Sequence, residues 1–181
     1  MDKKINILGF TGSLRKGSYN KAALRAAKEL MPEGSALDII DLAGIPFFNE
    51  DVEAEGIPEA VADFKNKIAA ADGLLIVTPE YNYSIPPVLK NALDWASRGK
   101  DSPLNGKHAA IMSASTGMFG GARSQYHLRQ VCVMVNILLF NKPEVFIPKA
   151  KEKFDVNGKL TDEYSIDSIS KLLKALVDEV K

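Results

Sequence analysis

The segment from residue 11 to residue 20 concentrates groups that can bind an anion. Hydroxyl, guanidinium and amide donors are supplied by Ser13, Ser18, Arg15 and Asn20, and the backbone is left open by Gly12 and Gly17. A helix predicted to begin at Asn20 adds the free N–H groups and the partial positive charge of its first turn. We interpret this segment as a site for a monophosphate. The simpler alternative is a helix start in which Ser18 or Asn20 is only the N-cap.

The same segment matches two nucleotide-binding motifs only in part. Gly12 and Gly17 have the spacing of the P-loop glycines, but Ser18 and Tyr19 stand where that motif requires Lys and then Ser or Thr. The Rossmann dinucleotide fingerprint is also incomplete, because its third glycine is missing. Hydrolysis of a nucleoside triphosphate is therefore not predicted.

A second segment, residues 78 to 87, combines a stiff backbone with flat side chains. Its prolines are Pro79, Pro86 and Pro87, its aromatic rings are those of Tyr81 and Tyr83, and its polar side chains include Glu80 and Asn82. Tyrosine rings held by such a turn can cradle a planar heteroaromatic ligand, or they can simply cover the core. We expect Glu80 to contact the ligand or its loop and not to act as an acid or base.

A third segment, residues 113 to 123, is rich in glycine. Ser115 and Gly117 are followed by Gly120 and Gly121, which lets a backbone approach a ligand closely. A flexible turn explains the same pattern, so we interpret this segment as part of a ligand site only if it lies beside the other two.

The elements around these segments alternate between short apolar runs and stretches of helical period. We predict strands over residues 4–10, 36–41, 73–78, 107–113 and 145–147. We predict helices over residues 20–31, 58–71, 87–98, 121–140 and 162–181, and a surface loop over 43–56. This rhythm indicates an α/β protein with a flavodoxin-like, doubly wound, five-stranded parallel sheet and helices on both faces, as one domain over residues 1–181. In that strand order the first and third strands flank the switch point, so their loops converge on one crevice.

Composition excludes several classes of protein. The 181 residues carry a formal net charge of zero, which disfavours binding to nucleic acid or to an anionic membrane. The longest apolar run, residues 131 to 140, is too short to span a bilayer. Cys132 lies within that run and is expected in the core, and neither His108 nor His127 has a partner at metal-ligand spacing. We predict a cytoplasmic protein without a metal site.

Together, the three segments resemble the NAD(P)H-dependent FMN reductase family, and within it the bacterial soluble quinone and chromate reductases. The likeness runs from the first strand to the sequence Asn141-Lys142-Pro143-Glu144 and fades after about residue 150. It implies that FMN is the cofactor and that its phosphate is held by Ser13, Arg15, Ser18 and Asn20. It also implies that the flavin ring and ribityl chain lie against Pro79, Glu80, Tyr81, Asn82, Tyr83, Ser115 and Gly117.

The resemblance further implies the reaction. FMN would take a hydride from NADPH or NADH and pass two electrons by a ping-pong scheme to quinones, flavins, azo compounds or metal oxyanions such as chromate. No catalytic side chain is assigned, because the cofactor carries the chemistry. The alternatives are a flavodoxin-type FMN electron carrier that docks to proteins and a regulatory module of similar fold. An electron carrier is expected to be strongly acidic, which this chain is not.

The long apolar helix predicted from Gly121 also suggests a homo-oligomer, either a dimer or a tetramer, because its apolar content exceeds what one sheet face would cover. In the chromate and quinone reductases that this chain resembles, the positions of Arg123, Tyr126 and Glu144 are linked between subunits. The resemblance therefore implies the same role here, whereas a long core helix needs no partner.

Overall fold

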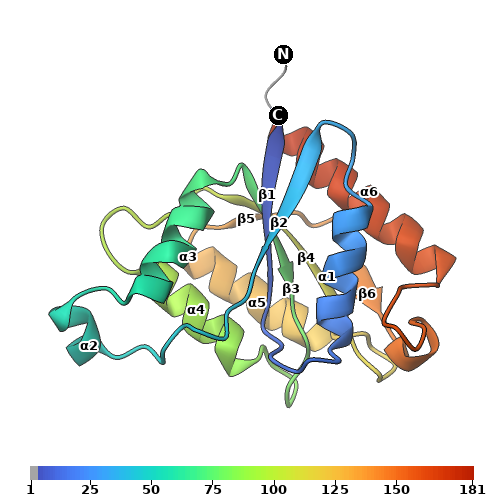
Figure 1. The fold of residues 1–181 in the computed structure, drawn as a ribbon, viewed down its shortest axis with the longest axis horizontal. Coiled ribbons are helices and arrows are strands. Elements are labelled where there is room, and N and C mark those ends of the chain that lie inside the picture. The colour runs from blue at the N-terminus through green and yellow to red at the C-terminus, as the bar shows by residue number, and fades with distance from the viewer. Residues whose placement is uncertain (1–3) are drawn as a thin grey trace.

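The computed structural model describes residues 4–181 and arranges them around one parallel sheet (Figure 1). The strands are β1 (Ile5–Thr11), β2 (Ser35–Ile40), β3 (Gly73–Val77), β4 (His108–Ala114), β5 (Leu138–Leu139) and β6 (Val145–Ile147). They lie in the order β2-β1-β3-β4-β5, β6 also pairs with β4, and all these pairings are parallel. The predicted doubly wound sheet is confirmed, with one additional short strand.

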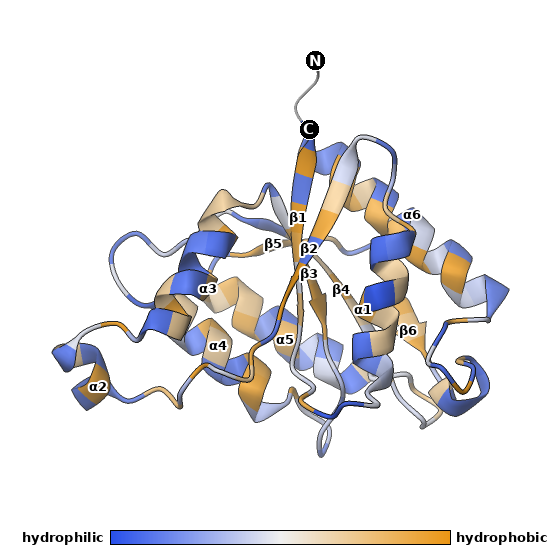
Figure 2. Cartoon of the chain, in the orientation of Figure 1, coloured by the Kyte–Doolittle hydropathy of each residue, from blue (hydrophilic) through white to orange (hydrophobic). Residues whose placement is uncertain are grey.

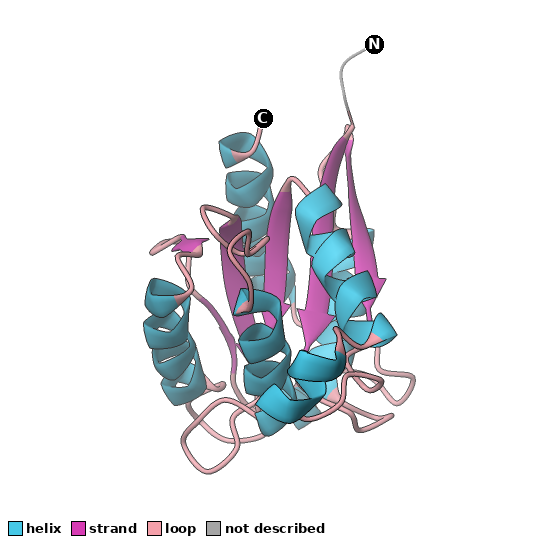
Figure 3. Cartoon of the chain, turned by 90° about the vertical axis from the view of Figure 1, so that its left-hand side faces the viewer, coloured by secondary structure: helices cyan, strands magenta, loops and turns pink. Residues whose placement is uncertain are grey.

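Helices cover both faces of this sheet (Figure 3). They are α1 (Tyr19–Glu29), α2 (Glu50–Glu55), α3 (Glu59–Ala70), α4 (Pro87–Ser97), α5 (Ala122–Met134) and α6 (Glu163–Glu179), with a 3-10 turn at Ala150–Glu152. The buried apolar side chains form two clusters, one beneath α1 and α6 and the other beneath α3, α4 and α5. In Figure 2 the central strands are largely hydrophobic and the helices are striped, the pattern of elements that bury one side against a sheet. Within residues 4–181 no helix is long and apolar enough to cross a membrane.

Two short strands share the fifth position of the sheet. β5 pairs with the start of β4 and β6 pairs with its end. The helix predicted over residues 121–140 is therefore wrong beyond Met134, where α5 ends. The reason is Asn136, which adopts a left-handed conformation with φ of 54° and turns the chain back toward the sheet edge. Its carbonyl oxygen accepts a hydrogen bond from the Gly106 N–H at 2.8 Å, which fixes the turn.

The connection from β2 to α3, residues 43–57, is here called the strap. Residues 43–56 are predicted as a surface loop, but they contain the six-residue helix α2, whose N-cap Asn49 accepts a hydrogen bond from the Asp51 N–H at 2.9 Å. None of the α2 residues is buried. Composition alone indicated a loop because this helix lacks an apolar face.

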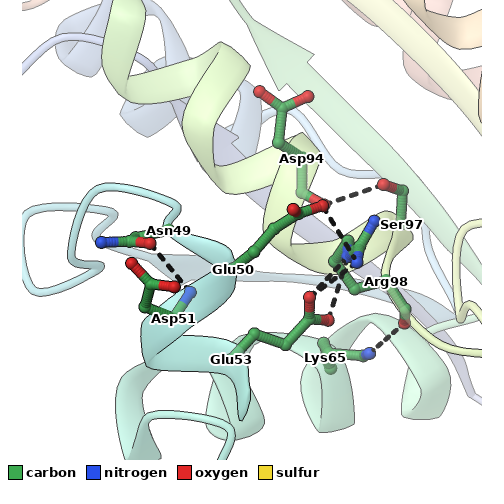
Figure 4. Close-up of polar contacts among 8 residues, drawn as sticks. All are labelled: Asn49, Glu50, Asp51, Glu53, Lys65, Asp94, Ser97 and Arg98. Atoms are coloured by element: carbon green, nitrogen blue, oxygen red, sulfur yellow. Dashed lines mark hydrogen bonds and ion pairs between the residues drawn. The ribbon is translucent and has the colours of Figure 1, made fainter.

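Side chains of α4 hold the strap in place. The Trp95 indole N–H donates to the Pro46 carbonyl at 2.8 Å, and the Phe48 ring packs edge-on against Trp95 with ring centroids 4.9 Å apart. Farther along, the Arg98 guanidinium forms an ion pair with Glu53 at 2.7 Å (Figure 4). This pairing lowers the pKa of the Glu53 carboxyl chiefly through the hydrogen bond from Arg98. The strap is thus attached at its start by Ile45, which packs against the apolar cluster beneath α3, α4 and α5, and farther along by a few partly buried contacts.

Candidate functional site

The segment that follows β1 packs tightly against the start of α4. A Cβ atom at Gly12 would lie 2.4 Å from the Pro86 Cγ and 2.8 Å from the Leu89 Cβ, so only glycine fits there. Ser13 and Ser18 are buried, while Arg15 is exposed. Ser18 is the N-cap of α1, since its hydroxyl oxygen accepts from the backbone N–H groups of residues 20 and 21 at 3.2 and 3.3 Å. The loop is therefore built at a helix N-terminus, where backbone and hydroxyl donors can meet a phosphate.

Asn20 connects this first loop to β4. Its side-chain amide donates to the Ala114 carbonyl at 2.8 Å, and its amide oxygen accepts from the Ala114 N–H at 2.9 Å. Both bonds are buried. Asn20 thus makes the kind of paired contact that a neighbouring strand would make, and it anchors the first loop next to the third.

The segment after β3 forms a tight two-residue hairpin. Tyr81 and Ser84 exchange two backbone hydrogen bonds of 2.9 Å, and Asn82 and Tyr83 between them have φ values of 49° and 68°. Positive φ at both central positions defines a type I′ turn, which asparagine adopts readily and tyrosine does not. The turn leaves Tyr81 and Tyr83 45% and 64% exposed, available to a planar ligand.

Glu80 bonds to the start of α5. Its carboxylate accepts hydrogen bonds from the Arg123 and Ser124 backbone N–H groups at 3.1 and 3.4 Å and from the Arg123 guanidinium at 3.1 Å. A carboxylate at a helix N-terminus is stabilised by the free N–H groups and the dipole of that helix. The expectation that Glu80 contacts its own loop or a ligand did not include this capping role.

A buried network of hydrogen bonds fixes the segment after β4 against the end of the sheet. The Ser113 hydroxyl donates to the Gly120 carbonyl at 2.6 Å, and the Gln125 amide donates to Ser113 at 2.7 Å and to the Val145 carbonyl at 2.8 Å. Gly121 has φ of 89°, and a Cβ atom there would lie 2.8 Å from that of Ser113. The glycines of this segment therefore allow it to lie close to the sheet.

Ser115 and Gly117 lie at the outer end of the same loop. The Gly117 N–H donates to the Ser115 hydroxyl at 3.1 Å, and the carbonyls of both residues accept from the chain that follows β6, each at 3.0 Å. The three segments singled out in the sequence follow β1, β3 and β4, which are adjacent in the sheet, so they share its carboxyl edge.

Two residues of this region, Pro86 and Phe119, make contacts that the sequence did not predict. Pro86 faces Gly12, and Phe119 packs on Arg123 with 4.3 Å between the guanidinium carbon and the ring centroid. Phe119 is 61% exposed, so a bulky aromatic residue in a glycine-rich loop was the available signal.

Of the remaining titratable candidates, His127 contacts the hairpin after β3, and Cys132 and His108 lie outside the three loops. Cys132 is buried in the core as predicted, and burial raises the pKa of its thiol to about 12. His127 bonds to the Ser84 hydroxyl through Nδ1 at 3.1 Å, and His108 lies 3.6 Å from a Glu179 oxygen. Among residues 4–181 no group of three potential metal ligands is found.

Comparison with known proteins gives the family. The sequence model of NADPH-dependent FMN reductases matches residues 5–152. The chain is 52% identical to an NAD(P)H-dependent FMN reductase of Pseudomonas aeruginosa over 176 residues, covering 97% of this chain and 95% of that protein. It is 41% identical to a quinone reductase of Escherichia coli K12 over 178 residues, with 97% and 95% covered.

A solved structure gives the same result at the level of the fold. The flavoenzyme FerB of Paracoccus denitrificans, an NAD(P)H:(acceptor) oxidoreductase, superposes with a TM-score of 0.88 at 31% identity and with 97% of each chain covered. The match of the family model over most of the chain and the high identity to these relatives lead to one conclusion: the chain belongs to the NADPH-dependent FMN reductase family and is an oxidoreductase that uses FMN and NAD(P)H.

Proposed function

We propose that this protein transfers two electrons from NAD(P)H to quinones through FMN bound at the carboxyl edge of the sheet. The observation that carries the proposal is the meeting of a phosphate-type loop, an aromatic hairpin and a glycine-rich loop above three adjacent strands. The residues present fit FMN: the cradle closed by Gly12 and the buried hydroxyls of Ser13 and Ser18 suit a phosphate. When bound, FMN supplies the hydride and electron chemistry, and the protein supplies binding and orientation.

Each of the proposed binding residues has a physical task. The groups for the phosphate are Ser13, Arg15, Ser18 and Asn20, and those for the ring and ribityl chain are Pro79, Glu80, Tyr81, Asn82, Tyr83, Ser115 and Gly117. Because one N–H of the Asn20 amide donates to the Ala114 carbonyl and its oxygen accepts from the Ala114 N–H, only the second N–H can serve the phosphate. The Glu80 carboxylate is held by α5, so we assign it the task of fixing the hairpin beside the ring.

We extend the acceptor range to flavins, azo compounds and metal oxyanions such as chromate. An open site with two exposed tyrosine rings supports a broad range of planar acceptors. A carrier that docks to partner proteins is the second candidate, and the balanced charge of the chain counts against it. We also propose that the protein works in the cytoplasm as a single-domain subunit, in keeping with its one buried, unpaired cysteine.

Binding of FMN can be tested at Arg15. Replacing Arg15 with alanine removes a charge-assisted contact to the phosphate, and the Kd for FMN is expected to rise about 10- to 100-fold. Arg25→Ala on the outer side of α1 is the control, because it removes the same charge away from the loop. Quenching of flavin fluorescence measures both affinities. No uptake of FMN by the parent protein, or equal affinity in the Arg15 variant, would refute the assignment.

The order of the two half-reactions is testable by steady-state kinetics. If donor and acceptor use the same space in turn, initial-rate plots at several fixed donor concentrations give parallel lines with FMN saturating. Intersecting lines would show that both bind at once. Flavodoxin-like carrier behaviour would appear as negligible turnover with NADPH and a small quinone.

We further propose that the protein is a dimer or tetramer that joins its subunits through the outer face of α5. Within one chain Arg123 already pairs with Glu80, and the Tyr126 hydroxyl donates to Glu144 at 3.4 Å. The long apolar helix that suggested this assembly is shorter than predicted, but Val133 and Met134 at its end are 81% and 86% exposed. These two side chains, with Tyr126, support the contact.

A further inference from the structure

Arg123, at the start of α5, touches both loops that border the proposed flavin ring. Its guanidinium carbon lies 4.0 Å from the ring centroid of Tyr83 and 4.3 Å from that of Phe119. Tyr83 belongs to the hairpin after β3, and Phe119 belongs to the loop after β4. One planar cation therefore links two loops that are far apart in the sequence.

The hairpin needs such a link because its backbone conformation is unfavourable. Tyr83 has φ of 68°, a region that a residue with a bulky side chain rarely occupies, and the residue is 64% exposed. Burial in the core thus does not hold it. The contacts that do hold the hairpin are its two internal hydrogen bonds, the bond from Ser84 to His127, and the stacking of Tyr83 on Arg123.

Glu80 fixes the guanidinium in this position. Its carboxylate accepts from the Arg123 side chain and from the first backbone N–H groups of α5, and it is only 13% exposed. The pair carries no net charge, so its effect on the loops comes from shape and stacking and not from attraction of a charged substrate. A lysine could keep the ion pair, but it has no planar group to occupy the space between two rings.

We propose that Arg123 is a positioning residue that joins the hairpin 81–84 to the loop 115–121, so that the two walls of the flavin site are held at a fixed separation. Arg123 acts through Tyr83 and Phe119 and does not touch the reacting atoms. This inference rests on the proposed function for its consequence, which is tighter binding of FMN and of planar acceptors. The linkage itself is a property of the flavin-free protein.

The experiment compares Arg123→Met, Arg123→Lys and Phe119→Leu with the control Arg129→Gln, whose arginine lies on the same helix and donates to the Phe140 carbonyl. Amide hydrogen exchange of Tyr81 and Ser84 in flavin-free protein reports on opening of the hairpin. Loss of one cation–π sandwich is expected to raise the exchange rate and the Kd for FMN by about 2- to 30-fold in Arg123→Met. Arg123→Lys should resemble it, Phe119→Leu should show a smaller change, and Arg129→Gln should match the parent.

In turnover assays the Arg123→Met substitution is expected to raise the KM for a benzoquinone by a larger factor than it lowers kcat. Light scattering on every variant separates loss of the hairpin from loss of an oligomer. Parent-like exchange in Arg123→Met, or parent-like values throughout in Arg123→Lys, would overturn the proposal. Because exposed Phe119 can be replaced with little risk to folding, the Phe119→Leu variant decides the matter if Arg123→Met does not fold. A parent protein that binds no FMN would refute the proposed function and leave the exchange result intact.

Discussion

Asn20 shows how one side chain can serve a site by holding the backbone of a neighbouring strand. Its amide forms two buried hydrogen bonds with the Ala114 backbone, at 2.8 and 2.9 Å, and so takes the place of a missing strand neighbour. Removing it leaves a buried N–H and a buried carbonyl without this partner, and such groups lose the compensation for their desolvation.

We expect Asn20→Ala to lower the free energy of unfolding of the flavin-free protein by roughly 1–3 kcal/mol. Urea denaturation without FMN measures this, because no phosphate contact contributes there. Asn105→Ala is the matched control: its side chain makes one exposed hydrogen bond, to Asn136. If Asn20→Ala were as stable as the parent, the anchoring role of Asn20 would be wrong.

At the scale of single residues, the sequence predicted which segments gather at the site better than it predicted their hydrogen-bond partners. The three segments that carry donors, rings and glycines do lie at one edge of the sheet, because the order of strands follows from their alternation with helices. The capping of α5 by Glu80 was not predictable, since it joins residues that are 43 apart in the sequence. The same holds for the pairing of Asn20 with Ala114, which are 94 residues apart.

Among the elements, α6 begins with the clearest electrostatic cap. The Asp162 carboxylate accepts from the Ser165 N–H at 2.9 Å and from the Lys153 ammonium at 2.7 Å. These contacts lower the pKa of Asp162, with the hydrogen bond from Lys153 the largest cause. Because the folded-state pKa lies below the unfolded one, the stabilisation is complete at neutral pH and is lost as the pH falls through the folded-state value.

Asp162→Ala is therefore expected to cost about 1 kcal/mol of unfolding free energy at pH 7, and the difference from the parent should shrink under acid conditions. Thermal or urea unfolding between pH 7 and pH 3 measures it. Asp167→Ala, in an exposed pair with Lys171 on the same helix, is the control and should change stability far less. If the difference in unfolding free energy between the variant and the parent did not change with pH, the charge of the Asp162 carboxylate would not contribute to stability.

The end of α5 shows where prediction of an element from its local sequence pattern fails. Residues 131 to 139 are all apolar except Asn136, so apolar content alone predicts one long helix. The helix ends at Met134 because the backbone at Asn136 is left-handed and the residues that follow pair with β4. Pairing with a distant strand decided the boundary, and a local pattern does not contain that information.

For the whole molecule, the proposed assembly makes a prediction about Glu144. Its carboxylate pairs with Lys142 at 2.7 Å, which lowers the pKa of Glu144, and it also accepts from the Tyr126 hydroxyl. Glu144→Arg would place two cations together beside the outer face of α5, and we expect the oligomer to dissociate. The mass measured by light scattering at micromolar concentration should then fall toward the monomer mass of 19.7 kDa.

The control for this experiment is Glu152→Arg, a charge reversal outside α5. It should leave the mass unchanged. FMN affinity should be retained in both variants, because the three loops of the site belong to one chain. If the parent itself has the monomer mass at this concentration, the assembly proposal fails.

The strap is only weakly attached to the rest of the molecule. Only its start, at Ile45, packs against an apolar cluster, its helix α2 buries none of its residues, and its outer end depends on the Arg98–Glu53 ion pair. Segments that open locally are the first to be cut by proteases, and salt weakens an ion pair that is partly open to solvent, as Arg98–Glu53 is. A glutamate-specific protease should therefore cut first at α2, and faster at high ionic strength. The two fragments should stay together, because β1 on one side of the cut is paired with β3 on the other.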